Sequence, residues 1–368
     1  MTGTVLTVFS AVLGAIIGSF LNACIHRMPR GISLNNPRRS FCPSCQRLIP
    51  WYENLPLLSW LALRGKCSGC GARISVRYFL VELLTAGVFL AIWRWYGLPL
   101  APVYWIFAAL LIAATFIDIE HFIIPDEITW GGTVAGLALS PVVPAMMQTA
   151  SRLEAFGLSL AGAALGYGLL WLIVEGGKLA FGKKRHVFGE PEPFFIRQEG
   201  EQIILGVGED RLPWEEIFYR LKSDILVLDC AAGKVGEREV TDTIVKFYHD
   251  RAVIGSEEIP IEQIDSVSGT LRAITVPREA MGFGDVKFIA CIGAFLGWKA
   301  VLFTICAASI IGCVAALAGL FIARDKAGSR VPFGPFLALG GAIWIFGGER
   351  LWDWYFGILR YGEGGIGF

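Results

Sequence analysis

Long apolar runs separated by short polar segments make up most of the chain. The runs cover residues 4–25, 79–96, 101–117, 128–147, 156–175, 286–302, 303–323 and 332–348. Several of them approach the ~20 residues with which an α-helix crosses the ~30 Å hydrocarbon core of a bilayer. The pattern therefore predicts an all-α polytopic membrane protein with about eight transmembrane helices.

The segment 183–280 departs from this pattern because it is polar over most of its length. It contains short runs of strand-forming residues at 202–205, 224–228 and 243–248, separated by glycines and charged clusters. Such runs between turn residues are typical of short β-strands. We expect a small β-rich cytoplasmic insertion here, and no motif within it indicates chemistry.

The composition agrees with a membrane protein. Hydrophobic residues make up 54% of the chain and charged residues only 17%, against about 25% charged in an average soluble protein. Lys plus Arg and Asp plus Glu are equal, at 32 each. Without an excess of positive charge, the chain has no general electrostatic attraction for phosphates, and we expect no nucleic-acid partner.

The charges in the loops predict the orientation of the helices. The first run is followed, not preceded, by basic residues and lacks a cleavage site, so we expect an uncleaved helix with its N-terminus outside. The loop 26–78 holds nine Lys and Arg residues against one acid, Glu53, which places it in the cytoplasm by the positive-inside rule. Alternation then puts 118–127, 176–285 and 324–331 on the same side. The last two of these carry further cations, namely Lys178, Lys183, Lys184, Arg185, Arg324, Lys326 and Arg330.

Four of the nine cysteines form two CxxC pairs in the first loop. Cys42 and Cys45 are followed by Cys67 and Cys70. Two such pairs about 20 residues apart, in a reducing compartment, are typical of a structural zinc site with four cysteine ligands. The alternative is a set of redox-active or incidental thiols. We expect the other cysteines to be small buried side chains.

Two acids mark the ends of apolar runs on the predicted cytoplasmic side. Asp118 ends the third run, and Asp285 opens the sixth after Gly282 and Gly284. Glycines allow a bend and a close backbone approach at the start of a helix, which could bring the two carboxyl groups together. Such a pair supports the acid/base chemistry of an aspartic protease, because one member keeps a proton. The alternative is that each acid is a solvated helix-end residue.

Several motifs together resemble the type IV prepilin peptidases. The resemblance covers about three-quarters of the chain in the family's order. The matching segments are Gly18-Ser19-Phe20-Leu21-Asn22, Ile25-His26-Arg27, Pro56-Leu57-Leu58-Ser59-Trp60, Leu63-Arg64-Gly65-Lys66-Cys67, Ile74-Ser75, Arg77-Tyr78, Glu82, Asp118, Gly282–Lys287 and Pro332-Phe333-Gly334-Pro335-Phe336.

The resemblance implies a bacterial inner-membrane aspartic endopeptidase with Asp118 and Asp285 as its catalytic pair. It also implies cleavage of the leader of prepilins or pseudopilins after a glycine, on the cytoplasmic side. Members with the cysteine-bearing loop are linked to N-methylation of the new N-terminal residue by S-adenosylmethionine. No GxGxxG motif follows a predicted strand, so methylation depends on the resemblance alone and the cofactor-binding residues stay unassigned.

Two departures from the family's motifs and three acids carry smaller expectations. Phe79 stands where the family usually has proline, and the insertion is longer than the family's usual linker. We expect Asp126 to be a helix cap, with a third catalytic group as the alternative. We expect Glu120 to face water, with tuning of the acid pair as the alternative. Either of these two acids, or Glu53, is a candidate for recognising a basic leader, while the basic first loop is expected to meet anionic lipid headgroups.

The predicted organisation has five parts. These are a first helix (1–25), a zinc-binding loop (26–78), helices with the first catalytic Asp (79–182), the β-rich insertion (183–280), and helices with the second catalytic Asp (281–368). Two other hypotheses remain open. One is a zinc-bearing membrane scaffold for a pilus or secretion assembly without peptidase activity, and the other is the same protease chemistry on a preflagellin-like substrate.

Overall fold

The computed structural model describes residues 2–36, 39–181, 183–199, 202–208, 210–218, 224–236, 238–255, 257–264, 266–277, 282–322 and 331–363. The chain forms two compact units, Met1–Trp171 with Gly282–Phe368, and Leu172–Met281. Four of the cations used to predict the topology, Arg38, Arg324, Lys326 and Arg330, lie outside the described residues. The same holds for the side chains of Lys178, Lys183 and Lys184.

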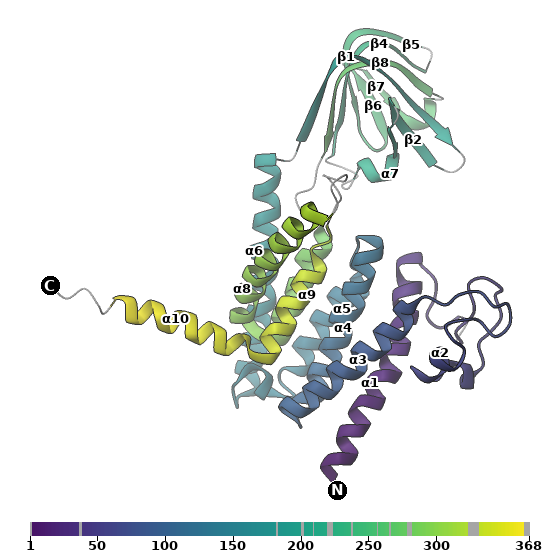
Figure 1. Ribbon diagram of the computed structural model, residues 1–368. Helices are drawn as coiled ribbons and strands as arrows, with labels where there is room; N and C mark the ends of the chain where they lie inside the picture. Colours follow the sequence, from purple (N-terminus) through teal and green to yellow (C-terminus); the bar gives the residue numbers. More distant parts are fainter. Residues whose placement is uncertain are drawn as a thin grey trace. The chain divides into compact units, whose positions relative to one another are not determined.

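The first unit is a bundle of helices (Figure 1). Its elements are α1 (Thr2–Arg27), α2 (Leu58–Ala62), α3 (Val76–Tyr96), α4 (Leu100–His121), α5 (Asp126–Leu139), the first part of α6 (Arg152–Phe181), α8 (Phe283–Ile322), α9 (Gly334–Ile343) and α10 (Glu349–Glu363). Helix α3 packs on α1 and α4, α4 packs on α9, and α8 packs on α5 and α9.

Five helical segments among the described residues are long and apolar enough to cross a membrane. They are Gly3–Arg30, Val76–Tyr96, Leu100–His121, Arg152–Gly177 and Phe283–Gly319. The all-α membrane unit with several spans is thus confirmed, whereas the count of eight is not. Helices α5 and α9 fall below the required length because they have only 14 and 10 residues.

Helix α8 contains the predicted run 286–302 and residues 303–322 of the next run. The backbone leaves helical geometry at Gly297, with φ 78° and ψ 178°. A Cβ added to Gly293 would lie 2.9 Å from Val301 Cγ2, whereas a straight helix would separate these positions by about 12 Å at 1.5 Å per residue. The chain therefore turns back at Gly297, six residues before the predicted boundary at 303, because glycine accepts this positive φ.

Small residues set the closest helix contacts in this unit. A Cβ on Gly18 would lie 2.7 Å from the Glu82 Cα, and one on Gly14 would lie 2.7 Å from the Ala86 Cα. Helix α1 therefore rests directly on the backbone of α3, as small residues four apart permit in membrane helices. This contact places the end of α1 beside the start of α3.

The second unit is an eight-stranded antiparallel sheet, which confirms the β-rich insertion. Its order is β3-β2-β1-β8-β4-β5-β6-β7. The strands are β1 (Lys183–Glu199), β2 (Gln202–Val207), β3 (Asp210–Pro213), β4 (Leu226–Val235), β5 (Arg238–Phe247), β6 (Arg251–Ile254), β7 (Glu257–Pro260) and β8 (Ser266–Pro277), with the short helix α7 (Trp214–Ile217) after β3. The three predicted runs fall mainly in β2, β4 and β5.

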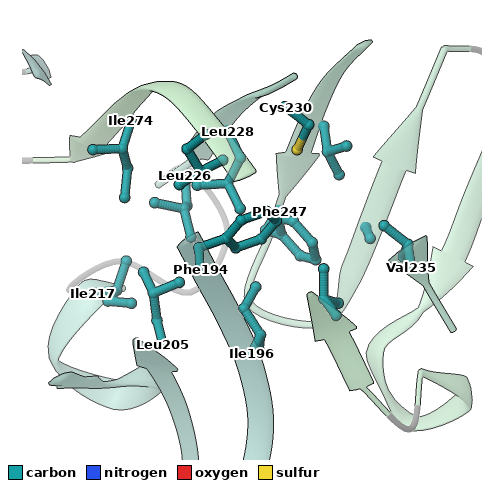
Figure 2. Packing of buried hydrophobic residues seen from close by; sticks show 14 of the residues in the cluster. Phe194, Ile196, Leu205, Ile217, Leu226, Leu228, Cys230, Val235, Phe247 and Ile274 are labelled. Carbon is teal, nitrogen blue, oxygen red and sulfur yellow. The ribbon is translucent and has the colours of Figure 1, made fainter. Parts of the chain in front are cut away.

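The sheet has its own hydrophobic core. Alternate residues of β4, among them Leu226, Leu228 and Cys230, are fully buried against Phe247 of β5 (Figure 2), as the two-residue period of a strand requires. The first and last strands pair, with Lys183 opposite Pro277. The two ends of the insertion therefore lie side by side.

Candidate functional site

Asp118 lies in the last turn of α4 and is only 5% exposed. The helix stops three residues later because Phe122 adopts a left-handed conformation, with its N–H donating to the Asp118 carbonyl at 2.9 Å. The carboxylate Oδ2 accepts a hydrogen bond of 3.0 Å from the backbone N–H of Gly334, the first residue of α9. A residue from the far end of the sequence therefore holds this carboxylate in place.

Asp285 lies in the first turn of α8 and is 7% exposed. Its N–H donates to the carbonyl of Gly282 at 3.1 Å. A Cβ on Gly282 would lie 3.6 Å from Asp285 Oδ2, so this glycine is in close contact with the carboxylate. The glycines of the motif thus form the turn that carries Asp285 into the bundle.

The two acids converge on the segment that follows α4. Ile124 lies against both Gly284 and Gly334. A Cβ added to Gly284 would lie 3.3 Å from the Ile124 Cβ, and one added to Gly334 would lie 2.9 Å from the Ile124 Cδ1. Gly284 directly precedes Asp285, and Gly334 bonds Asp118. The charge of Asp118 also acts electrostatically on Asp285. The structure therefore brings together the two carboxyl groups that the sequence singled out.

Asp126 differs from its predicted role. Helix α5 is preceded by Pro125 at its N-cap, without a side-chain capping bond, and Asp126 is the first helical residue. Its carboxylate pairs with Lys287 Nζ at 2.6 Å, and Lys287 lies over the ring of Phe283. The ion pair attaches the start of α5 to the start of α8, beside the two buried acids.

Glu120 is also engaged within the chain. It forms an ion pair with Arg77 at the start of α3, and His121 lies 4.0 Å from its other oxygen. Glu53 pairs with Arg47 at 3.2 Å. Each of the three acids considered for leader recognition therefore already has a cationic partner in this chain.

The four loop cysteines form one cluster. Their sulfur atoms all lie within 4.8 Å of one another, and Cys42 Sγ is 3.9 Å from Cys70 Sγ. Four sulfurs at ~2.3 Å from a tetrahedral zinc ion would be about 3.8 Å apart. The cluster therefore fits a four-coordinate metal ion, as the CxxC spacing predicted.

Two matching backbone turns build this cluster. In the first, the Cys42 N–H donates to the Arg47 carbonyl, and Gln46, which follows Cys45, has φ 58°. In the second, the Cys67 N–H donates to the Ala72 carbonyl, and Gly71, which follows Cys70, has φ 71°. The two turns therefore share one backbone geometry, and each of them presents two thiols.

The pKa values of Cys42 and Cys70 are shifted in opposite directions. Hydrogen bonds, first from the Cys45 backbone N–H, lower the pKa of Cys42 to about 6 against the cost of burial. For Cys70, the Ala72 N–H lowers the pKa, but the neighbouring cysteines raise it to about 11. A cation bound among the four sulfurs would favour the thiolate form of these groups.

A cavity of about 340 Å³ lies between the cysteine loop, the end of α1 and the start of α3. It is lined by Glu82, a buried acid whose Oε2 accepts from the Leu57 N–H at 2.7 Å. It is also lined by Asn22, whose Oδ1 is buried and has no hydrogen-bond partner among the described residues. The sequence motifs contain both residues, but no local pattern places them at one cavity.

Comparison with known proteins matches two family models. The model "Bacterial Peptidase A24 N-terminal domain" matches residues 12–96, which include the cysteine cluster. The model "Type IV leader peptidase family" matches residues 105–190 and 264–317, which include Asp118 and Asp285. Most of the β-sheet unit lies between the two matched parts of the second model.

Relatives named "Prepilin leader peptidase/N-methyltransferase" come from several bacteria. The Myxococcus xanthus protein is 47% identical over 167 residues, 45% of this chain and 47% of that protein. The Aeromonas hydrophila protein is 29% identical over 373 residues, 92% of this chain and 90% of the relative. The Dichelobacter nodosus protein is 34% identical over 213 residues, 50% of this chain and 70% of the relative. No solved structure matches the chain.

Proposed function

Because this chain belongs to the type IV leader peptidase family, we propose that it is a membrane aspartic endopeptidase for type IV prepilins or pseudopilins, with N-methyltransferase activity. Asp118 and Asp285 are its catalytic residues. The observation that carries this assignment is the meeting of two buried acids, one from each family motif, around Ile124.

In peptide hydrolysis by this pair, one carboxyl group acts as the general base and the other acts as the general acid. The ionised carboxylate takes a proton from water, whose oxygen attacks the carbonyl carbon, while the protonated carboxyl donates its proton to the carbonyl oxygen. The carbon–nitrogen bond then breaks as the leaving nitrogen takes the proton that the first carboxylate removed from water. The other carboxylate recovers a proton from a hydroxyl group of the intermediate, which restores the carbonyl. Burial and mutual repulsion keep one of the two carboxyl groups protonated, which this division of roles requires.

The proposed orientation places both acids at the cytoplasmic edge of the inner membrane. The basic loop 26–78 supports it through the positive-inside rule, and Asp118 follows one further pair of helices along the chain. Helices α5 and α9 and the two parts of α8 on either side of Gly297 would raise the number of membrane segments to eight. A prepilin helix in the membrane would then present its leader to the acids from the cytoplasm.

The cysteine cluster is proposed to bind structural zinc through Cys42, Cys45, Cys67 and Cys70. All four ligand positions of a tetrahedral ion are filled by protein sulfurs, so no open position remains for water or substrate. The ion would fix the fold of a loop that has few buried side chains of its own. Its role is therefore to shape the surface of the loop.

N-methylation is proposed to act on the amino group that cleavage exposes. S-adenosylmethionine supplies a methyl group on a positively charged sulfur, which leaves as a neutral thioether when the amine nitrogen takes the methyl and loses a proton. The chain must bind this donor and bring the new N-terminus to it. The relatives described above are named as processing enzymes, which favours this activity over a non-catalytic scaffold.

One experiment tests the whole proposal. The detergent-purified protein is incubated with a prepilin, with and without S-adenosylmethionine, and the products are weighed by mass spectrometry. We expect loss of the leader in both reactions and an added methyl group only with the donor. An intact prepilin in both reactions would reject the peptidase, and a preflagellin-like substrate cleaved in its place would support the alternative substrate.

A further inference from the structure

The cavity beside the cysteine loop has the properties of a small-molecule site. Its volume of about 340 Å³ lies within the ~300–1,000 Å³ range of ligand pockets. It is formed by the end of α1, the start of α3 and the loop that carries the two cysteine turns. All three elements fall within residues 12–96, so the site is separate in sequence from both Asp118 and Asp285.

A buried carboxylate without a cationic partner and a buried amide oxygen without a hydrogen-bond donor lie at this cavity, among the residues that the structure describes. Glu82 is 8% exposed and accepts bonds from the Leu57 N–H and from Ser19, yet among the described residues no positive charge compensates it. Asn22 is 2% exposed and donates through Nδ2 to the Tyr78 carbonyl, while its Oδ1 is unpartnered. A buried carboxylate and a buried amide oxygen are stabilised by a ligand that is positively charged and donates hydrogen bonds.

The rest of the lining indicates the other parts of the ligand. The rings of Phe41, Trp60 and Tyr78 line the cavity and offer flat apolar surface to an aromatic base. Arg73 lines the same cavity and offers a cation to a ligand carboxylate. A nucleoside joined to an amino acid that carries a positive charge combines all these features.

The cavity also lies near the end of the helix that carries Asp118. His26, which lines the cavity, is influenced electrostatically by Arg77 and by Glu120. Arg77 pairs with Glu120, two residues after Asp118 in α4. Arg77 and Glu120 therefore connect the surroundings of the cavity to the helix that carries Asp118.

We propose that this cavity is the binding site for S-adenosylmethionine and that Glu82 balances the positive charge of this methyl donor. The proposal rests on the methyltransferase part of the proposed function. Asn22 supplies a further acceptor, and the aromatic rings contact the adenine. The competing occupant is the processed substrate's own N-terminal residue, which also carries a positive charge.

Direct binding measured without any substrate tests this site. The purified full chain is titrated with S-adenosylmethionine by calorimetry, as wild type, as Glu82→Gln and as Glu349→Gln. Glu349 is a matched control because it lines a different cavity and accepts bonds from Gln148. We expect Glu82→Gln to weaken binding by at least about tenfold, as for loss of a bond to a charged group, and Glu349→Gln to leave it unchanged. Leader cleavage in all three proteins reports that they are folded.

Photolabelling of the wild type provides a second readout that does not depend on a variant. Irradiation with radiolabelled S-adenosylmethionine should label peptides within 40–60 or 72–82. Label found only elsewhere, or unchanged affinity in Glu82→Gln, would overturn the proposal. Unchanged donor affinity with a raised KM for the cleaved substrate would instead assign the cavity to the substrate's N-terminus. A wild type that cleaves but neither binds the donor nor methylates would reject the methyltransferase function itself.

Discussion

The backbone N–H of Gly334 donates a hydrogen bond of 3.0 Å to the Oδ2 of Asp118, across 216 positions of sequence. Gly334 begins α9, whereas Asp118 ends α4. A side chain at this position would displace the carboxylate, because a Cβ would lie 2.6 Å from Oδ2. Gly334 therefore donates a hydrogen bond to the Asp118 carboxylate, and its lack of a side chain leaves room for that carboxylate.

Replacing Gly334 with alanine should slow leader cleavage. The new methyl group must push Asp118 or the start of α9 aside, at a cost of about 1–3 kcal/mol, and a misplaced carboxylate should slow leader cleavage at least about tenfold. Gly341→Ala in the same helix is the control, because its Cβ would approach no neighbour closer than 3.7 Å. Equal cleavage rates in the two variants would show that Gly334 does not position Asp118.

If the cluster binds zinc as proposed, replacing Cys45 with serine should release the ion and destabilise the loop. Three remaining thiolates bind zinc more weakly, so we expect lower zinc content by mass spectrometry and a lower melting temperature. Cys306 lies outside the cluster and is exposed, so the expectation that it is buried was wrong. Cys306→Ser should change neither quantity. Full zinc occupancy in Cys45→Ser would exclude this cysteine as a ligand.

The ion pair between Arg77 and Glu120 should stabilise the contact between the start of α3 and the end of α4, the helix that carries Asp118. Because both side chains are partly buried, a double-mutant cycle with Arg77→Met and Glu120→Gln should give a coupling of about 0.5–1 kcal/mol. Thermal unfolding of the four proteins measures this energy. Strictly additive effects would show that the two charges do not interact.

Removing the sheet should leave cleavage intact. The insertion has its own core, its ends are paired at Lys183 and Pro277, and every contact described for the two acids lies within the other unit. Replacing 183–277 with a short Gly/Ser linker should therefore keep the cleavage rate within about threefold, since short linkers span such a distance. Complete loss of cleavage in a folded deletion variant would assign the sheet a direct part in catalysis.

The sequence indicated the features that depend on local pattern. Each apolar run overlaps a helix, although the run 128–147 extends eight residues past the end of α5 at Leu139. The strand-forming runs fall mainly in strands, and the CxxC spacing predicts the cysteine cluster. The glycines before Asp285 correctly suggested a turn that carries the acid inward. Each of these features follows from residues close together in the chain.

Features that depend on distant residues were not visible in the sequence. The bond from Gly334 to Asp118 and the ion pairs of Glu120 and Asp126 join segments 43 to 216 positions apart. Glu120 and Asp126 were predicted to face water and to cap a helix, and only tertiary packing supplies their partners. The same holds for Asn22 and Glu82, which line one cavity because α1 rests on α3 at Gly18.

The central claim is that Asp118 and Asp285 act as one catalytic pair. It is tested most directly by measuring leader cleavage of a prepilin by mass spectrometry with Asp118→Asn, Asp285→Asn and the control Asp126→Asn. Asp126 lies beside the pair but is 61% exposed at its side chain and bound to Lys287. We predict a loss of at least about 10³-fold for each of the first two variants and near-normal cleavage for the control. Cleavage at the wild-type rate by either Asp118→Asn or Asp285→Asn would contradict the account.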